Sequence, residues 1–198
     1  MVSILVSADD IKTGLPGYTP DRAGEFHTES AKLADKKFYE HLGSFKHEAV
    51  VLMSGGPASG KTEFVTEYLM DKNYLILDGI LPTEIGAKIK IEKIKKIKKK
   101  IVIYAVWPLD LKQAYMAFLH RDRKFGDEHF FQKHYSARKT LLWIAENYRN
   151  IDIRIVINSY IAEDLRFTEL QFDSRQELVD HLEENQYYVS DIIKEVTE

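Results

Sequence analysis

The sequence contains no cysteine, which excludes disulfide bonds and catalysis by a thiolate. No apolar run approaches the roughly 20 residues of a membrane-spanning helix, so we expect no membrane partner. The formal net charge is only −3, and it argues against the broad basic surface of a nucleic-acid binder. The opening residues, MVSILVSADD, lack the basic start of a signal peptide and predict a strand. We therefore expect a cytoplasmic protein.

The 198 residues, of which 44% are hydrophobic, suffice for one domain with a buried core. Short apolar runs alternate with helical patterns, which is typical of a parallel sheet with helices on both faces. We predict a single α/β domain over residues 1–198 that ends in an edge strand and a helix from near Ser174. The tail from Tyr187 is expected to be a terminal helix or a frayed end. The runs expected to form parallel strands are Val2–Ser7, Ala49–Met53, Tyr74–Leu77, Ile101–Val106 and Ile151–Ile157.

A lysine-rich stretch, KIKIEKIKKIKKK, covers Lys88–Lys100. Ile94, Ile97 and Ile101 keep a helical spacing among the lysines. We therefore favour an amphipathic surface helix whose isoleucines cover the sheet, over a site for a polyanion or a membrane surface.

The segment VVLMSGGPASGKTEF, Val50–Phe64, places glycines directly after an apolar run. Gly55, four further residues, Gly60, Lys61 and Thr62 satisfy the phosphate-loop pattern of nucleoside-triphosphate-binding proteins. A turn that only reverses the chain does not explain a lysine followed by a threonine. The pattern therefore predicts a nucleotide site.

The chemistry of this loop follows from its residue types. Glycines let the backbone curl around a phosphate, and the amides of the following helix favour its negative charge. Lys61 adds a point charge toward the β- and γ-phosphates of ATP, and Thr62 offers a hydroxyl to Mg²⁺. The residues expected to bind the nucleotide are Gly55, Gly56, Pro57, Ala58, Ser59, Gly60, Lys61 and Thr62.

The residues on both sides of the loop support this prediction. Val50–Met53 has the apolar character of a central strand. The residues that follow predict a helix over Thr62–Met70, whose inner side comprises Phe64, Val65, Tyr68 and Leu69.

Phosphoryl transfer also needs a carboxylate near the acceptor hydroxyl. Asp9 and Asp10 follow the first apolar strand and Asp78 follows a later one, where open α/β sheets bind ligands. We expect one of the first pair to act as base and the other to contact the acceptor. Glu29 lies in the first turn of a helix expected from about Thr28. The alternative roles are capping of local turns and complementing a helix dipole.

The segment FLHRDRKFGDEHFFQKHYSARKT is rich in cationic side chains. It suits a mobile lid over polyphosphate, spanning about residues 121–139, with Arg121, Arg123 and Arg138 as candidate phosphate ligands. The alternative is an ordinary basic helical hairpin. The histidines expected to be surface or packing residues, and not metal ligands, are His129 and His134.

Together these motifs resemble the zeta-toxin family of phosphate-loop kinases over Ser3–Tyr160. The resemblance implies that GGPASGKT binds ATP, that Asp9 in ADDIKTGLPGY is the base, and that Lys12 holds the basic position. It also implies that Glu29 in HTESA contacts the acceptor and that Asp78 matches the acidic end of a family strand. In the family the loop precedes the aspartate-bearing strand, so the order here is permuted.

The resemblance further implies that the lid arginines stabilise the transferred phosphate, with Arg123 and Arg138 as the best matches and Arg121 beside them. The implied reaction is ATP-dependent phosphorylation of a hydroxyl of a UDP-sugar such as UDP-N-acetylglucosamine, with an antitoxin protein as a partner. Two alternatives stay open. One is a nucleotide-binding regulatory or partner-docking module, and the other is a kinase for a nucleic-acid end or an antibiotic hydroxyl.

Overall fold

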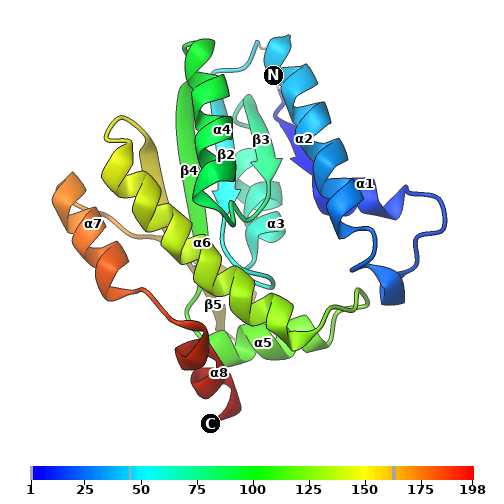
Figure 1. Ribbon diagram of the computed structural model, residues 1–198. Coiled ribbons are helices and arrows are strands. Elements are labelled where there is room, and N and C mark those ends of the chain that lie inside the picture. The colour runs from blue at the N-terminus through cyan, green and yellow to red at the C-terminus, as the bar shows by residue number, and fades with distance from the viewer. Residues whose placement is uncertain (1, 45, 162–163) are drawn as a thin grey trace.

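A computed structural model describes residues 2–44, 46–161 and 164–198. Its centre is a six-stranded sheet with the order β1-β3-β2-β4-β5-β6 (Figure 1). The first five strands in this order are parallel, and β6 is antiparallel to β5, so the predicted α/β class with a parallel sheet is confirmed. The strands are β1 (Ile4–Ser7), β2 (Ala49–Ser54), β3 (Tyr74–Asp78), β4 (Lys100–Pro108), β5 (Asp152–Ile161) and β6 (Asp164–Glu169).

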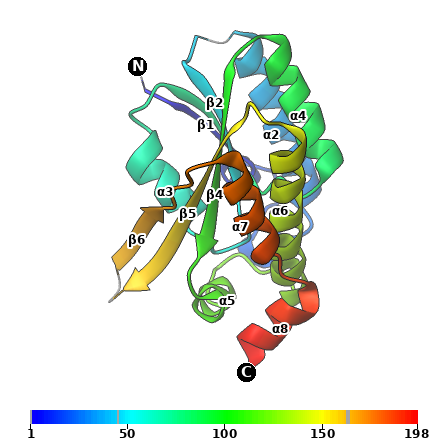
Figure 2. The same ribbon diagram turned by 90° about the vertical axis from the view of Figure 1, so that its left-hand side faces the viewer.

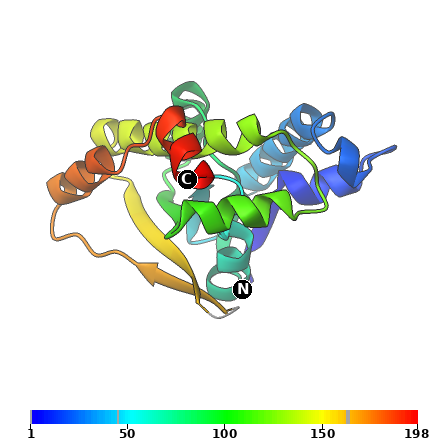
Figure 3. The same ribbon diagram turned by 90° about the horizontal axis from the view of Figure 1, so that it is seen from below.

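Helices cover both faces of this sheet, but unequally. One face packs against α2, α4, α6 and α7, and the other packs against α3 and its π-helical continuation η2 (Figure 2). A third cluster joins α5, α6 and α8, as the view from below shows (Figure 3). The helices are α1 (Ala8–Thr13), η1 (Pro20–Arg22), α2 (His27–Gly43), α3 (Lys61–Phe64), η2 (Val65–Leu69), α4 (Glu84–Lys96), α5 (Leu111–Leu119), α6 (Asp127–Asn147), α7 (Arg175–Glu184) and α8 (Val189–Thr197).

The first strand lies at an edge of the sheet, one strand removed from β2. Ser7 of β1 is the partner of Asp78 in β3, and Leu77 of β3 is the partner of Leu52 in β2. The carboxyl ends of these three parallel strands therefore meet at one edge, which is where ligands bind in open α/β sheets. The sequence order of the strands does not keep Asp9 away from the phosphate loop.

The lysine-rich helix is displaced from its predicted position: it begins at Glu84 and ends at Lys96, four residues earlier at each end. Thr83 caps α4 by accepting a hydrogen bond from the amide of Gly86, and the helix ends at Lys96. The predicted helix extended to Lys100, but Lys100 is the first residue of β4. Ile94 is fully buried against the sheet, whereas Ile97 is 38% exposed because it lies beyond the last helical turn.

The cationic segment divides into two parts. Residues 121–126 connect α5 to α6, and residues 127–139 belong to α6. Phe130, His134 and Ala137 of that helix are buried, so this part is packed into the fold and is not a lid. A lid limited to 121–126 stays a prediction, as does the single domain. Within the described parts of the chain, no helix is both long and apolar enough to cross a membrane.

Two isoleucines of α4 provide a test of this packing. Ile94→Ala should lower the free energy of unfolding by about 2–5 kcal/mol, because it removes fully buried methylene groups from the core. Ile97→Ala should cost less than about 1 kcal/mol, since this side chain is partly in water. Urea denaturation of both variants measures the difference, and equal losses would contradict the observed end of the helix.

Candidate active site

The phosphate-loop segment leaves β2 and enters α3, so the predicted strand, loop and helix are confirmed. Gly60 precedes the helix with φ 89°, a left-handed conformation that favours glycine. The helix continues into η2, and the expected inner side is confirmed at Phe64, Val65 and Leu69. Tyr68 is a correction. It is 41% exposed and stacks on Phe64 at the surface of the helix.

The side chain of Lys61 folds back over its own loop. Its amine donates to the carbonyl oxygens of Gly55 and Gly56 at 2.9 and 2.7 Å, and to Ser59 Oγ at 3.3 Å. Burial lowers the pKa of Lys61 to about 8, although the nearby carboxylate of Asp78 favours the charged form. The amine therefore lies at the centre of the loop, where a phosphate would replace these carbonyl contacts.

Thr62 and Asp78 meet on the neighbouring side of the loop. Thr62 Oγ1 donates a hydrogen bond to Asp78 Oδ2 at 3.0 Å. Burial raises the pKa of Asp78, while Lys61 and Thr62 act in the opposite direction. A hydroxyl and a carboxylate at this spacing are oxygen ligands of the kind that Mg²⁺ prefers. Among the described residues, no group of three or more His, Cys, Asp or Glu side chains could hold a metal ion alone.

Asp9 lies in the first turn of α1, between two cations. Lys12 donates to Asp9 Oδ1 at 3.0 Å, and Arg123 pairs with Asp9 Oδ2 at 2.5 Å. Lys12 is only 1% exposed, and its amine also lies over the ring of Phe125. Burial acts to raise the pKa of Asp9, but Arg123 and Lys12 outweigh it and hold the pKa below its usual value. Asp9 is therefore a carboxylate at neutral pH.

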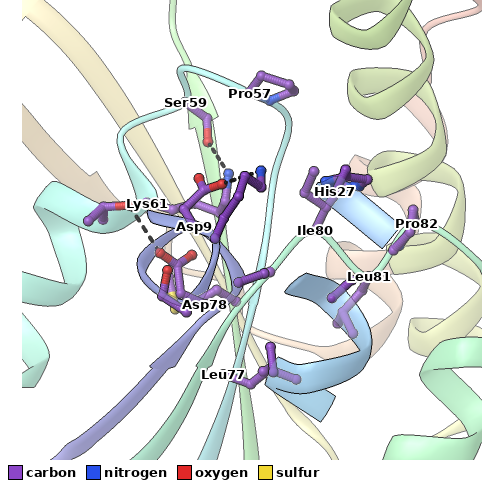
Figure 4. A pocket seen from close by; sticks show the side chains of 18 of the residues that line it. Asp9, His27, Pro57, Ser59, Lys61, Leu77, Asp78, Ile80, Leu81 and Pro82 are labelled. Carbon is purple, nitrogen blue, oxygen red and sulfur yellow. Dashed lines mark hydrogen bonds and ion pairs between the residues drawn. The ribbon is translucent and has the colours of Figure 1, made fainter. Parts of the chain in front are cut away.

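One cavity of about 360 Å³ joins these groups. Asp9, Lys61 and Asp78 lie on one side of it, and Ile80 and Leu81 lie on the other (Figure 4). The far wall is mostly apolar and comes from α2, α4 and the loop between β3 and α4. The residues of this far part of the wall are Ala31, Ala34, Ile80, Leu81, Pro82, Thr83, Gly86 and Ala87, with Asp35 and Lys90 forming an ion pair of 3.0 Å.

Most of the residues predicted from the sequence come together here. Gly55 and Gly56 take part through their carbonyl contacts with Lys61. The predicted residues that line the cavity are Asp9, Lys12, Pro57, Ala58, Ser59, Gly60, Lys61, Thr62, Asp78, Arg121 and Arg123.

Three predicted residues lie elsewhere. Asp10 and Glu29 are exposed and outside the cavity lining, because their helices α1 and α2 turn these positions to solvent. Arg138 is 4% exposed in the core, where its guanidinium lies over Trp107 and donates to the carbonyl oxygen of Asn185 at 2.7 Å. It therefore packs α6 and does not reach the cavity.

The sequence did not identify an aromatic group in the cavity wall. Phe125 and His129 stack with ring centroids 4.4 Å apart, and His27 meets His129 edge to face at 5.5 Å. All three line the cavity. His27 stands two positions before Glu29, but nothing in the local pattern favours one over the other. His129 was expected to be a surface or packing residue, and it packs on Phe125 in the cavity wall.

Comparison with known proteins supports the fold. No protein-family model matches the sequence, and no curated protein matches it. The chain is 13% identical to a chain of the AvrRxo1-ORF1:-ORF2 crystal structure with ATP, with a TM-score of 0.54, covering 89% of this chain and 79% of that one. For the native AvrRxo1-ORF1:-ORF2 complex the identity is 13% and the TM-score 0.51, covering 83% and 74%. These likenesses show the fold alone.

A further solved structure belongs to the PezAT chromosomal toxin-antitoxin system of Streptococcus pneumoniae. Its identity is 11% and its TM-score 0.45, covering 98% of this chain and 72% of that one.

Two glycines of the cavity wall test the loop conformation. A Cβ at Gly60 would lie 2.4 Å from Asn158 Nδ2 in a left-handed backbone, whereas one at Gly79 would meet open space. We expect Gly60→Ala to lower the free energy of unfolding by about 1–3 kcal/mol, and Gly79→Ala to change it by less than about 1 kcal/mol. Urea denaturation checks both values, and a neutral Gly60→Ala would contradict the described loop.

The aromatic group predicts a pH dependence. Burial, and then the charges of His27 and Lys133, lower the pKa of His129 to about 4. This pKa lies below the value near 6.5 of a histidine in the unfolded chain. The contribution of His129 to the free energy of unfolding is therefore complete above pH 6.5 and is lost as the pH falls toward 4. NMR titration should show His129 neutral at pH 5.5. An imidazolium at that pH would be the contrary result.

Proposed function

We propose that this protein is an ATP-dependent small-molecule kinase that transfers the γ-phosphate to a hydroxyl group. One observation carries the proposal: a single cavity joins Lys61 and Thr62 of the phosphate loop to the carboxylate of Asp9. The fold shared with the AvrRxo1-ORF1:-ORF2 structures supports it, and one of those structures contains ATP. ATP bound with Mg²⁺ supplies an activated phosphoryl group.

The loop residues bind and orient the polyphosphate. Lys61 exchanges its contacts with the carbonyls of Gly55 and Gly56 for phosphate oxygens, which stabilises the charged form that burial disfavours. Thr62 and Asp78 present the oxygen atoms that would hold Mg²⁺. Since Mg²⁺ is commonly held by one or two protein groups together with phosphates and water, this pair fits its requirements.

Asp9 orients the acceptor hydroxyl and takes its proton. Lys12 and Arg123 each contact one carboxylate oxygen, and each oxygen keeps a second lone pair for the acceptor. A base of lowered pKa suits phosphoryl transfer through a loose transition state, where positioning contributes more than early proton removal. Arg121 and Arg123 line the same cavity and neutralise charge on the transferred group.

The acceptor that the zeta-toxin resemblance supports is a UDP-sugar such as UDP-N-acetylglucosamine. In this proposal His27 takes the acceptor contact first assigned to Glu29, because His27 lines the cavity and Glu29 does not. The resemblance also suggests an antitoxin partner, and the AvrRxo1-ORF1:-ORF2 structures are likewise complexes. The proposal includes a cytoplasmic location. The permuted order of the motifs belongs to the same proposal.

A second acceptor class is favoured by the apolar part of the wall. Ala31, Ala34 and Leu81 offer no hydrogen-bonding side chain to a polar sugar. An acceptor with a less polar body, such as an antibiotic hydroxyl, would bury apolar surface there. A regulatory module that only binds the nucleotide is the remaining alternative, and it needs no acceptor.

Mass spectrometry of the purified protein with ATP and a panel of UDP-sugars and hydroxylated antibiotics tests the proposal. We expect one product with an added phosphate and its loss in Lys61→Ala. Asp9→Asn should lower the transfer rate by roughly 10²–10⁴-fold because the proton acceptor is lost. The matched control is Asp10→Asn, whose side chain lies outside the cavity and whose rate should stay within about twofold.

Equal rates for Asp9→Asn and Asp10→Asn would contradict the role of Asp9. ATP binding without a phosphorylated product would favour the regulatory module.

A further inference from the structure

Two buried side chains hold the phosphate loop from outside the cavity. His134 Nε2 of α6 lies 2.9 Å from the carbonyl oxygen of Pro57, and Asn158 Nδ2 of β5 donates to the carbonyl oxygen of Ser59 at 3.1 Å. His134 is 2% exposed and Asn158 is fully buried. Neither residue lines the cavity, whereas the loop residues Pro57 and Ser59 do (Figure 4).

These two contacts fix the direction of the next backbone amides. In a planar trans peptide the C=O and the following N–H point to opposite sides. When His134 holds the carbonyl of Pro57 on the outside, the N–H of Ala58 is turned toward the cavity side. In the same way, Asn158 holds the carbonyl of Ser59 on the outside, and the N–H of Gly60 is turned toward the cavity side. Inward N–H groups are the donors with which such loops bind phosphate.

The glycines of the loop match these two neighbours in shape. A Cβ on Gly56 would lie 2.3 Å from the ring of His134, and one on Gly60 would lie 2.4 Å from Asn158 Nδ2. The glycines therefore allow α6 and β5 to approach the loop backbone closely. A carbonyl oxygen only accepts hydrogen bonds, so His134 Nε2 carries a proton, and burial lowers the pKa of His134 to about 3, which keeps the ring neutral.

We propose that His134 and Asn158 are positioning residues that orient the phosphate-loop amides for the triphosphate. This inference rests on the proposed function, because it assigns how the same site recognises ATP. Neither residue touches the reacting atoms. They act through the peptide groups of Pro57 and Ser59, and their removal leaves Lys61 and Asp9 in place.

The test compares four variants by isothermal titration with ATP and Mg²⁺, and by hydrogen–deuterium exchange of residues 55–62 in the ligand-free protein. His134→Phe and Asn158→Leu keep a similar shape without the donor, and His134→Gln keeps an N–H. The matched control is Arg138→Met, which removes another buried hydrogen bond of α6 away from the loop.

We expect His134→Phe and Asn158→Leu to raise the dissociation constant for ATP about tenfold and to speed exchange of the loop amides. His134→Gln should stay within about threefold of the wild type. Arg138→Met should lower the melting temperature without changing ATP affinity by more than about twofold.

Unchanged ATP affinity and unchanged loop exchange in folded His134→Phe would overturn the inference. An equal loss of affinity in Arg138→Met would also overturn it, because the effect would then be general destabilisation. If the wild type bound no ATP, the proposed function would fail, and loop exchange in His134→Phe would still decide whether the loop is held. ATP binding that depends on His134 without any phosphorylated acceptor would support the inference and reject the kinase.

Discussion

The parallel pairing of β1 with β3 is the interaction on which the candidate site depends. It aligns Ser7 with Asp78, and the pairing of β3 with β2 then aligns both with the start of the phosphate loop. An antiparallel first strand would end at the opposite edge of the sheet and carry Asp9 away from Lys61. The backbone hydrogen bonds of one short edge strand thus assemble a cavity whose groups come from distant parts of the chain.

The charged side chains inside the cavity are stabilised by the groups that contact them. Lys12 is buried and Lys61 is half-buried, and an isolated charge in such a position would be unfavourable. Lys12 is compensated by Asp9 and by the ring of Phe125, whereas Lys61 is compensated by loop carbonyls and the field of Asp78. Burial nevertheless lowers the pKa of Lys61, because these contacts do not fully replace the water that the amine has lost. A polyphosphate would supply the missing negative charge.

The motifs formed by neighbouring residues could be predicted from the sequence, whereas the direction in which a helix points its side chains could not. The strand, the loop and Thr62 follow from residue order and spacing, and the Asp9 and Asp78 positions follow from where parallel strands end. Arg138 was misplaced because a cationic side chain looks the same in sequence whether it faces a ligand or lies over Trp107. The remaining parts, such as the contact of Arg123 with Asp9 and of His134 with the loop, join residues far apart in the chain and have no local pattern.

The order of the strands has a consequence for the nascent chain. As the protein leaves the ribosome, Asp9 emerges first but β1 has no partner until residues 74–78 of β3 follow it. The phosphate loop is then present without its outer supports, which arrive with His134 and Asn158. Because domains fold as units once their long-range partners are available, nucleotide recognition is postponed until most of the polypeptide has been synthesised.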